Sequence, residues 1–365
     1  MKKILIIGPF PEPISGVALA NKVVKEVLDK ALDFDVKVIN TSYPIFEDAI
    51  GSFSFKKLLF FLGLNFKYLK ILKKDIVYIT PGQTFFGISK YTFLILFSWL
   101  LRKELIIHVH GNYLGTQYEI LKGIKKKLFY FLISRFTKGI VLSDSLKPNL
   151  TPFLNSSNIF VVPNFAEDYL CKSNNRGFNN KLNIVFLSNL MEEKGILYLL
   201  ESLKKLEEKN INYEAKIAGN IDSLLIETIT SKIKKLKHTS YIGVVYREEK
   251  RKLLEWGNIF VLPTFYKMEG QPISILEALA TQNVIIATNH AGIPDIIKNS
   301  INGFIIETKN SNSIFEVLLY LDKNKQVIKD ISDFNKNYFT ENFTLRTFSN
   351  NIINVLNANT RTKNI

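Results

Sequence analysis

The chain has 365 residues, of which 47% are hydrophobic, a length and composition that favour two domains with buried cores and exclude a disordered chain. The single cysteine, Cys171, excludes an internal disulfide and a cysteine-rich metal site, and the four histidines show no metal-ligand spacing, so we expect no metal and no cofactor. The net charge is +15: Lys and Arg number 22 against 11 Asp and Glu through Phe165, and 26 against 22 after it. This bias suits a nucleic acid or an anionic membrane as partner.

The first half alternates short apolar strands with helical patterns, which predicts a parallel sheet covered by helices. Its opening residues lack the long apolar run of a signal peptide, so we interpret them as the first strand. The longest apolar stretch, Tyr91 to Leu101, is far shorter than the roughly 20 residues of a membrane span. We therefore expect a soluble or peripheral protein. The predicted strands are Lys3–Ile7, Asp35–Ile39, Asp75–Ile79, Leu105–Val109, Gly139–Leu142 and Ile159–Val162.

A loop from Gly8 to Gly16 follows the first strand, and a helix is expected to open near Val17. Its glycines permit a ligand to approach the backbone closely. Their spacing fits neither the dinucleotide fingerprint nor the P-loop, so a purely structural turn remains an alternative.

The segment from Ser54 to Lys74 contains six lysines and no acidic residue. Apolar residues recur between the lysines at roughly helical spacing, and we interpret the segment as a helix lying on an anionic membrane surface. A core helix with a lysine-rich face fits the same pattern. The apolar residues are Leu58, Leu59, Phe61, Leu62, Leu69 and Leu72.

Two histidines, His108 and His110, lie at the end of the fourth predicted strand and point to the same side if the strand continues to Gly111. A neutral imidazole at His110 can hydrogen-bond a substrate hydroxyl, and a charged one can stabilise an anion. A structural role for the pair stays open.

Residues 166–181 are polar and read as a linker between a first domain, 1–165, and a second, 182–335. A final helical segment, 336–365, contains a helix near Thr344 to Leu356 that is long enough to pack back on the first domain. The strands predicted in the second domain are Leu182–Leu187, Glu214–Ala218, Tyr241–Val245, Ile259–Leu262, Val284–Ala287 and Phe304–Ile306.

The second domain places Asn189 and Lys194 after its first strand and before a helix. The Lys194 ammonium can reach a phosphate as a point charge. A cation near a helix N-terminus is otherwise mildly unfavourable, which favours a bound anion over a merely exposed lysine.

The run from Glu269 to Ala278 places two carboxylates around a helix start. Pro272 suits the first helical turn, so Glu269 should lie in the preceding loop and Glu277 inside the helix. Carboxylates at these positions can accept hydrogen bonds from hydroxyls of a ribose and of a sugar.

Between the carboxylates, the free N–H groups near Ile273 and Ser274 form an anion site that fits a diphosphate. The apolar run Asn258 to Thr264 precedes this segment, and ligands of α/β sheets bind beyond the carboxyl ends of strands. We therefore infer a sugar-nucleotide site. A capped amphipathic helix with two surface glutamates is the alternative.

These motifs together resemble the retaining glycosyltransferases of family four. The resemblance covers nearly the whole chain, is strongest from 182 to 306, and includes Gly16, the pair His110-Gly111 and the run from Val162 to Asn164 in the first half. It implies the GT-B architecture: an α/β protein with two Rossmann-like, doubly wound domains facing across a cleft. The motifs are Ser188 to Gly195, Asn258 to Thr264, Glu269 to Ala278, Asn283 to Thr288 and Gly292 to Ile297.

The resemblance implies roles for individual residues. Lys194 would hold the donor diphosphate, Glu277 the ribose and Glu269 the transferred sugar. His110 would meet that sugar from the opposite wall, and Gly16 would let its loop approach the reacting centre. The implied catalytic residues are His110 and Glu269, and the implied donor-binding residues are Gly16, Asn189, Lys194, Gly270, Ile273, Ser274 and Glu277.

Family members retain anomeric configuration without a metal, the leaving phosphate helping to accept the proton of the acceptor hydroxyl. This chain departs from the pattern at three positions. Asn189 stands where many relatives have an arginine, Ser15 stands where a second glycine is common, and Asp295 takes a place often held by glutamate. Because of the first departure, phosphate binding would depend more on Lys194.

We therefore expect a retaining glycosyltransferase that uses a nucleotide diphosphate sugar. The expected acceptor is a hydroxyl of a glycan, or of a polyprenyl-diphosphate-linked glycan, in bacterial surface polysaccharide synthesis (capsule, O-antigen or exopolysaccharide). The expected location is the cytoplasmic, inner face of the membrane, with an anionic membrane surface as partner. Alternatives are a non-catalytic nucleotide-sugar or membrane-binding module and a nucleotide-sugar epimerase. We expect no nucleic-acid partner, because no known module for it is present.

Overall fold

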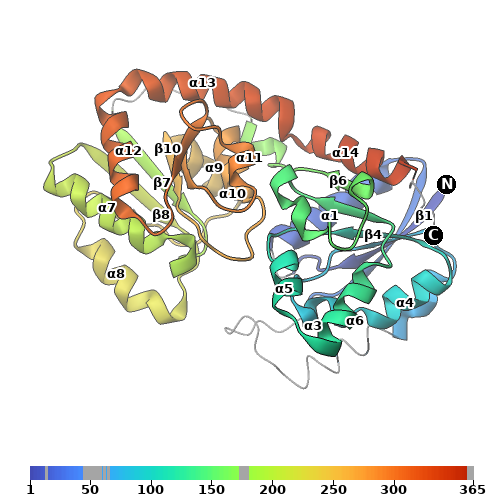
Figure 1. The fold of residues 1–365 in the computed structure, drawn as a ribbon. Helices are drawn as coiled ribbons and strands as arrows, with labels where there is room; N and C mark the ends of the chain where they lie inside the picture. The colour runs from blue at the N-terminus through green and yellow to red at the C-terminus, as the bar shows by residue number, and fades with distance from the viewer. Residues whose placement is uncertain (13–14, 44–59, 61–62, 64–65, 172–180, 360–365) are drawn as a thin grey trace. The chain divides into compact units, whose positions relative to one another are not determined.

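The computed structural model describes residues 1–12, 15–43, 60, 63, 66–171 and 181–359. The chain divides into two compact units, the first formed by Met1–Pro163 with Ser349–Ile365 and the second by Asn164–Phe348 (Figure 1). The division falls two residues before the predicted end of the first domain at residue 165.

The first unit is built on a six-stranded parallel sheet in the order β2-β1-β3-β4-β5-β6. The central strands are buried along nearly their whole length, as expected of a parallel sheet covered on both faces. The strands are β1 (Lys2–Gly8), β2 (Phe34–Asn40), β3 (Ile76–Ile79), β4 (Glu104–His108), β5 (Lys138–Val141) and β6 (Ile159–Val161).

Helices connect these strands. They are α1 (Gly16–Lys30), α3 (Phe85–Ser89), α4 (Thr92–Leu100), α5 (Leu114–Ile120) and α6 (Gly123–Ile133), with 3₁₀ turns η1 (Phe66–Ile71), η2 (Asp144–Asn149) and η3 (Ser156–Asn158). Within the described ranges, no helix is both long and apolar enough to cross a membrane.

The C-terminal residues of the first unit are held by two lysines. Lys138 is fully buried, lies 2.5 Å from Glu104 and donates a 2.8 Å hydrogen bond to the carbonyl of Val355. Lys2 donates to the carbonyl of Leu356. These carbonyls lie in the last turn of α14 (Leu345–Asn357), where a cation compensates the unpaired groups of a helix C-terminus.

The second unit has a six-stranded parallel sheet in the order β12-β11-β10-β7-β8-β9. The chain starts at β7, adds strands on one side, and then crosses to β10 on the other side of β7. This order gives the sheet a topological switch point between β7 and β10. The strands are β7 (Leu182–Leu187), β8 (Tyr213–Ala218), β9 (Thr239–Tyr241), β10 (Ile259–Leu262), β11 (Val284–Thr288) and β12 (Gly303–Ile306).

Helices cover both faces of this sheet (Figure 1). They are α7 (Ile196–Glu208), α8 (Ile226–Lys234), α9 (Arg247–Trp256), α10 (Ile273–Ala280), α11 (Ile293–Ile296), α12 (Ser311–Lys323) and α13 (Lys325–Asn342), with 3₁₀ turns η4 (Asp168–Cys171), η5 (Glu192–Lys194) and η6 (Ser223–Leu225). The predicted segment 336–365 therefore begins inside α13 and continues through α14.

The predicted strand Tyr241–Val245 was misplaced. The edge strand β9 spans Thr239–Tyr241, with Thr239 opposite Ala215 of β8. The apolar Ile242 and Val244, which suggested a later strand, follow it and are 39% and 44% exposed. On an edge strand, apolar content alone does not locate the paired residues.

Two predicted segments lie partly outside the described residues. Of the expected interfacial helix, Ser54 to Lys74, the apolar residues 58, 59, 61 and 62 are not among those described, and residues 66–71 form η1. Of the predicted linker 166–181, residues 172–180 are not described, whereas residues 168–171 form η4.

Candidate functional site

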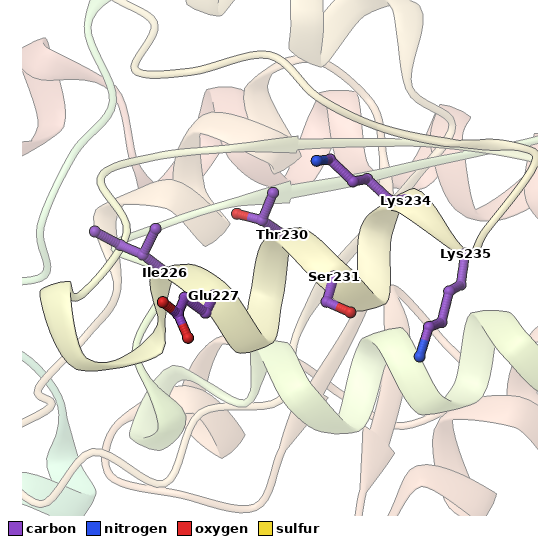
Figure 2. Close-up of a pocket in the computed structure, with 6 residues that line it drawn as sticks. All are labelled: Ile226, Glu227, Thr230, Ser231, Lys234 and Lys235. Carbon is purple, nitrogen blue, oxygen red and sulfur yellow. The ribbon is translucent and has the colours of Figure 1, made fainter.

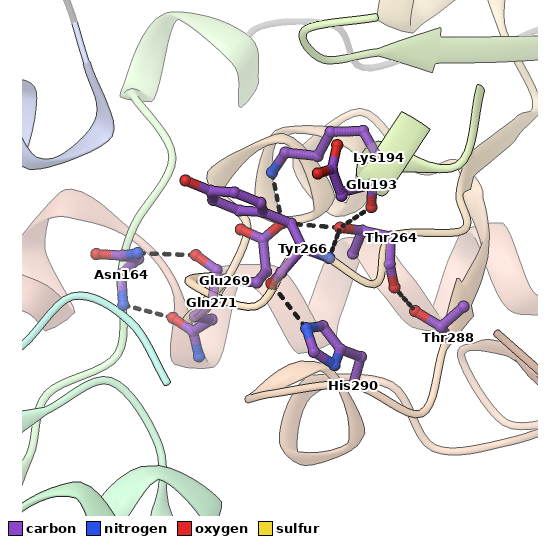
Figure 3. Close-up of polar contacts among 9 residues, drawn as sticks. All are labelled: Asn164, Glu193, Lys194, Thr264, Tyr266, Glu269, Gln271, Thr288 and His290. Carbon is purple, nitrogen blue, oxygen red and sulfur yellow. Dashed lines mark hydrogen bonds and ion pairs between the residues drawn. The ribbon is translucent and has the colours of Figure 1, made fainter. Parts of the chain in front are cut away.

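Polar side chains gather at the switch point of the second unit, beyond the carboxyl ends of β7 and β10. The turn after β7 supplies Glu193 and Lys194, and the loop after β10 supplies Thr264, Tyr266 and Glu269 (Figure 3). Because β7 and β10 are adjacent and parallel, their carboxyl ends bring these two segments together.

Lys194 and Glu269 form an ion pair at the centre of this cluster. The Lys194 Nζ lies 2.5 Å from Glu269 Oε2, and their side chains are only 15% and 10% exposed. The same carboxylate oxygen lies 3.2 Å from the Thr264 hydroxyl. The ammonium also stands 5.1 Å from the ring centre of Tyr266. The two residues were predicted separately, and the structure places them in direct contact.

Gly195 allows the turn that carries Lys194 to approach β10. Its φ is +82°, and a Cβ at this position would lie 2.2 Å from the carbonyl oxygen of Pro263. Only glycine fits such an approach in a left-handed conformation. Phe265 completes the contact by donating its N–H to the carbonyl of Glu193 at 2.7 Å.

The loop that carries Glu269 is anchored from three directions. His290 Nε2 lies 2.8 Å from the carbonyl oxygen of Tyr266, and the Thr288 hydroxyl donates to the carbonyl of Thr264 at 2.5 Å (Figure 3). Asn164 donates from its backbone and its side chain to Gln271, at 2.6 and 2.9 Å. These bonds hold the loop on both sides of Glu269.

The helix that follows, α10, begins at Ile273, one residue later than predicted from Pro272. Pro272 occupies its N-cap and provides no side-chain cap, while Ile273 and Ser274 form its first turn and are partly exposed. Their N–H groups lie among those that a helix leaves without intrahelical partners. Gly270 is buried beside them, and its carbonyl accepts from Gly292 at 2.9 Å.

Glu277 lies inside α10 and has a partner that the sequence did not reveal. Its carboxylate forms an ion pair with Lys250 of α9, whose ammonium also stands 6.0 Å from the ring centre of Tyr169. Burial raises the pKa of Glu277, Lys250 opposes that shift, and Glu167 adds to it. For Lys250, burial lowers the pKa, but Glu277 and Tyr169 together outweigh burial and raise it.

Asn189, the departure from the family pattern, lies just beyond β7 and is exposed. Its backbone carbonyl accepts from the N–H of Met191 at 3.0 Å. Because an amide carries no charge, Lys194 supplies the cation of this turn.

The first unit places both predicted histidines at the end of β4. The strand ends at His108 rather than continuing to Gly111, yet the rings of His108 and His110 lie 3.9 Å apart. Tyr78 of β3 forms a hydrogen bond with Nδ1 of His108. The Nε2 atoms of both histidines are buried and have no hydrogen-bond partner among the described residues.

Burial lowers the pKa of both imidazoles, to about 4 for His110, and the neighbouring His110 adds to the shift at His108. Both rings are therefore neutral near pH 7, and each keeps an orphaned polar atom. Neutral His110 suits a hydrogen bond to a ligand hydroxyl better than a contact with an anion.

Gly16 is the first residue of α1 and is exposed. Ser15, which stands where a second glycine is common, caps this helix by accepting from the N–H of Ala18 at 3.1 Å. The substitution thus provides an N-cap hydrogen bond that a glycine lacks.

A separate hollow of about 460 Å³ lies along one face of α8 (Figure 2). Its lining comes from α8 and the C-cap residue Lys235, at successive spacings of one and three residues, and Figure 2 shows the side chains pointing in several directions. Five of its six lining residues are polar or charged, but their polar groups do not meet at one point, as those of a ligand site do. The lining residues are Ile226, Glu227, Thr230, Ser231, Lys234 and Lys235.

Residues 172–338 match the family model for glycosyl transferases group 1. The amylovoran biosynthesis glycosyltransferase AmsK of Erwinia amylovora is 25% identical over 147 residues, which cover 39% of this chain and only 36% of that protein. The UDP-Gal:alpha-D-GlcNAc-diphosphoundecaprenol alpha-1,3-galactosyltransferase of Escherichia coli is 25% identical over 278 residues, covering 71% of this chain and 69% of that protein.

Among solved structures, Anabaena HepE in complex with UDP superimposes with a TM-score of 0.75 at 16% identity, covering 98% of this chain and 99% of HepE. This likeness confirms the predicted α/β fold with two Rossmann-like domains of the GT-B type.

Proposed function

We propose that this chain, whose residues 172–338 match the family model for glycosyl transferases group 1, moves a sugar from a nucleotide diphosphate sugar to a hydroxyl of a glycan. The observation that carries the proposal is the Lys194–Glu269 pair beside the N-terminus of α10. One cation, one carboxylate and unpaired N–H groups are the chemistry that a sugar diphosphate requires.

The donor would replace this ion pair by two better-matched contacts. Lys194 and the N–H groups of Ile273 and Ser274 would take the diphosphate, whose negative charge grows as the sugar departs. Glu269 would then accept hydrogen bonds from sugar hydroxyls, which compensate it for the lost ammonium. Glu277, held by Lys250, would accept from the ribose.

We propose a retaining transfer that needs no metal or other cofactor. Lys194 and the α10 N-terminus provide positive charge for the leaving diphosphate, which is the task a metal performs in other transferases. The leaving phosphate would accept the proton of the acceptor hydroxyl. His110, neutral because of its burial, would hydrogen-bond the transferred sugar.

We propose UDP as the donor nucleotide and a lipid-linked glycan as the acceptor, in bacterial surface polysaccharide synthesis. The Escherichia coli relative supports both choices, since its name states a UDP-sugar donor and a diphosphoundecaprenol-linked acceptor, and HepE was solved with UDP. A polyprenyl-linked acceptor would place the protein at the inner face of the membrane.

The test is a thermal-shift series with UDP, GDP, ADP and their sugar conjugates, with EDTA present throughout. Stabilisation by the UDP series alone is expected, followed by transfer to a diphosphate-linked lipid acceptor with retained anomeric configuration, read by NMR. Stabilisation without transfer to any acceptor would indicate a non-catalytic module, and donor conversion without acceptor would indicate an epimerase.

A further inference from the structure

Helix α4 of the first unit is predominantly apolar, yet three of its nine residues are exposed. Leu94 and Ile95 face the core and are at most 1% exposed. Phe93 and Leu100, seven residues apart on the opposite side, are 61% and 68% exposed, and Trp99 is 42% exposed. A helix that is apolar all round normally lies inside a protein or against another apolar phase.

Neighbouring elements continue this apolar surface. Phe131 of α6 is 39% exposed, and its ring lies 6.2 Å from that of Trp99. On the other side, Leu69 and Leu72 at η1 are 59% and 49% exposed. Contacts join η1 to α4: the rings of Tyr68 and Phe97 lie 4.8 Å apart, and Lys103 donates to the carbonyl of Leu72 at 3.2 Å. We call these exposed residues, Leu69, Leu72, Phe93, Trp99, Leu100 and Phe131, the α4 face.

Positive charge surrounds the α4 face. Residues 66–103 contain seven Lys and Arg and one acidic residue, Asp75. Lys67, Lys70 and Arg102 are exposed. The Arg135 guanidinium lies 4.9 Å from the ring centre of Trp99 and 4.6 Å from that of Phe131, which holds a cation directly over the aromatic pair.

We propose that the α4 face docks on a lipid bilayer with anionic headgroups. Its aromatic rings would sit at the boundary between headgroups and acyl chains, and its lysines and arginines would meet lipid phosphates, an arrangement that suits interfacial proteins. The proposal rests on the proposed function, because a lipid-linked acceptor is presented at such a surface. It places membrane contact on α4, α6 and η1.

Charge complementarity favours an anionic lipid bilayer over other partners of the α4 face. Apolar side chains alone would suit any hydrophobic partner, and cations alone would suit a nucleic acid. The combination of exposed Phe93 and Leu100 with a cationic surround matches a phase that is apolar inside and anionic outside.

The test is co-sedimentation of the full chain with phosphatidylcholine vesicles and with vesicles that also contain phosphatidylglycerol. Wild type is expected to bind the anionic vesicles. The double variant Phe93→Ser, Leu100→Ser should bind on the order of tenfold more weakly, because two exposed apolar side chains no longer enter the bilayer. Lys67→Glu with Lys70→Glu should weaken binding to the anionic vesicles only.

Leu32→Ser is the matched control, since Leu32 is 94% exposed in the same unit and lies outside the α4 face. It should bind as wild type does. Absence of wild-type binding to both vesicle types would overturn the proposal, as would equal binding by the double variant. Concentration-dependent dimerisation abolished by Phe93→Ser and Leu100→Ser, without vesicle binding, would instead make the face a protein interface.

A thermal shift by UDP measured on each variant separates this proposal from the proposed function. The nucleotide site lies on the second unit, so the shift should be unchanged by substitutions in the α4 face. A variant that loses vesicle binding but keeps the thermal shift by UDP is altered only in the α4 face. A wild-type protein that shows no thermal shift with UDP would instead contradict the proposed function.

Discussion

Lys194 Nζ lies 2.5 Å from Glu269 Oε2, and the two residues come from turns that follow different strands of one sheet. Both side chains are largely buried, so neither charge can turn to solvent when the other is removed. A donor bound as proposed must therefore supply each residue with a new partner at the same time. A nucleotide diphosphate sugar has both an anion for Lys194 and sugar hydroxyls for Glu269. A free nucleotide diphosphate offers this pair only the anion, because its ribose hydroxyls are assigned to Glu277.

This difference predicts the behaviour of Glu269→Gln. The amide can still meet the Thr264 hydroxyl but no longer holds Lys194 electrostatically. Binding of UDP alone should be unchanged or tighter, because the ammonium no longer has to leave a carboxylate. Transfer should fall by about 10²–10³ in kcat, the cost of removing one contact to the reacting sugar. Isothermal titration and a transfer assay measure the two effects.

For this prediction, the thermal unfolding midpoint of the variant without ligand serves as the folding control. A folded Glu269→Gln enzyme with undiminished transfer would falsify the role proposed for the carboxylate.

Lys194→Met should weaken nucleotide diphosphate binding by roughly tenfold to a hundredfold, the range for a lost hydrogen bond to a charged group. Position 189 is an asparagine rather than an arginine, so it provides no second cation to compensate for the lost ammonium. Lys309→Met is the control, because Lys309 is exposed and lies over the ring of nearby Phe265 without pairing with Glu269. Equal loss of UDP affinity in both variants would point to general electrostatics instead of a specific contact.

Much of the fold was predictable because parallel strands are continuous apolar runs. Leu182–Leu187 and Ile259–Leu262 were placed without error at either end, since their neighbours on both sides are polar or turn residues. The edge strand β9 was misplaced, because an edge strand needs fewer apolar residues and the apolar run after it is exposed.

The candidate site was predictable where residues follow a strand end, as Lys194 and Glu269 do, or lie in the helix that comes next, as Glu277 does. Lys250 was not, because it lies on α9 in a run of charged residues that reads as a solvated helix face. Its contact with Glu277 depends on the packing of two helices that sequence spacing does not specify. Thr264 and His290 gave a weak signal, as polar residues following β10 and β11, and only the structure shows which groups they hold.

Lys250→Met should destabilise the protein in a pH-dependent way. Burial already raises the pKa of Glu277, and loss of the ammonium raises it further. Above that folded pKa the buried carboxylate is unpaired and costs on the order of 3–5 kcal/mol. As the pH falls through it, proton uptake neutralises the group, so the variant's stability deficit should shrink. Urea unfolding at about pH 8 and about pH 5 measures the change.

The double variant Lys250→Met, Glu277→Gln is the control for this charge argument. Its free energy of unfolding should be reduced less than that of Lys250→Met at high pH, and this reduction should depend little on pH. A deficit in Lys250→Met that is the same at both pH values would mean that lost packing, rather than the unpaired carboxylate, explains the effect.

Gly195→Ala should lower stability and donor affinity together. An L-residue at φ +82° costs on the order of 1–2 kcal/mol, and the new Cβ would press on the Pro263 backbone, which must then shift. Because Lys194 directly precedes Gly195, such a backbone shift also moves the Lys194 ammonium. Gly243→Ala controls for strain alone, since Gly243 has φ +81° and no atom within 4 Å of a Cβ there. Equal UDP affinity in both alanine variants would contradict the link to Lys194.

His110 should remain neutral throughout the pH range in which the enzyme is assayed. Burial lowers its pKa from 6.5 to about 4, so the unfolded chain binds more protons than the folded one between these values. The contribution of His110 to stability is therefore complete above pH 6.5 and is lost as the pH falls through about 4.

His110→Asn should show a weaker loss of stability over that interval. The imidazole Cε1–H resonance that disappears in His110→Asn should not shift between about pH 8 and about pH 5. A titration midpoint near pH 6.5 for that resonance would show that the ring is solvated and becomes charged. This outcome would contradict the proposed role of His110 as a neutral hydrogen-bonding group.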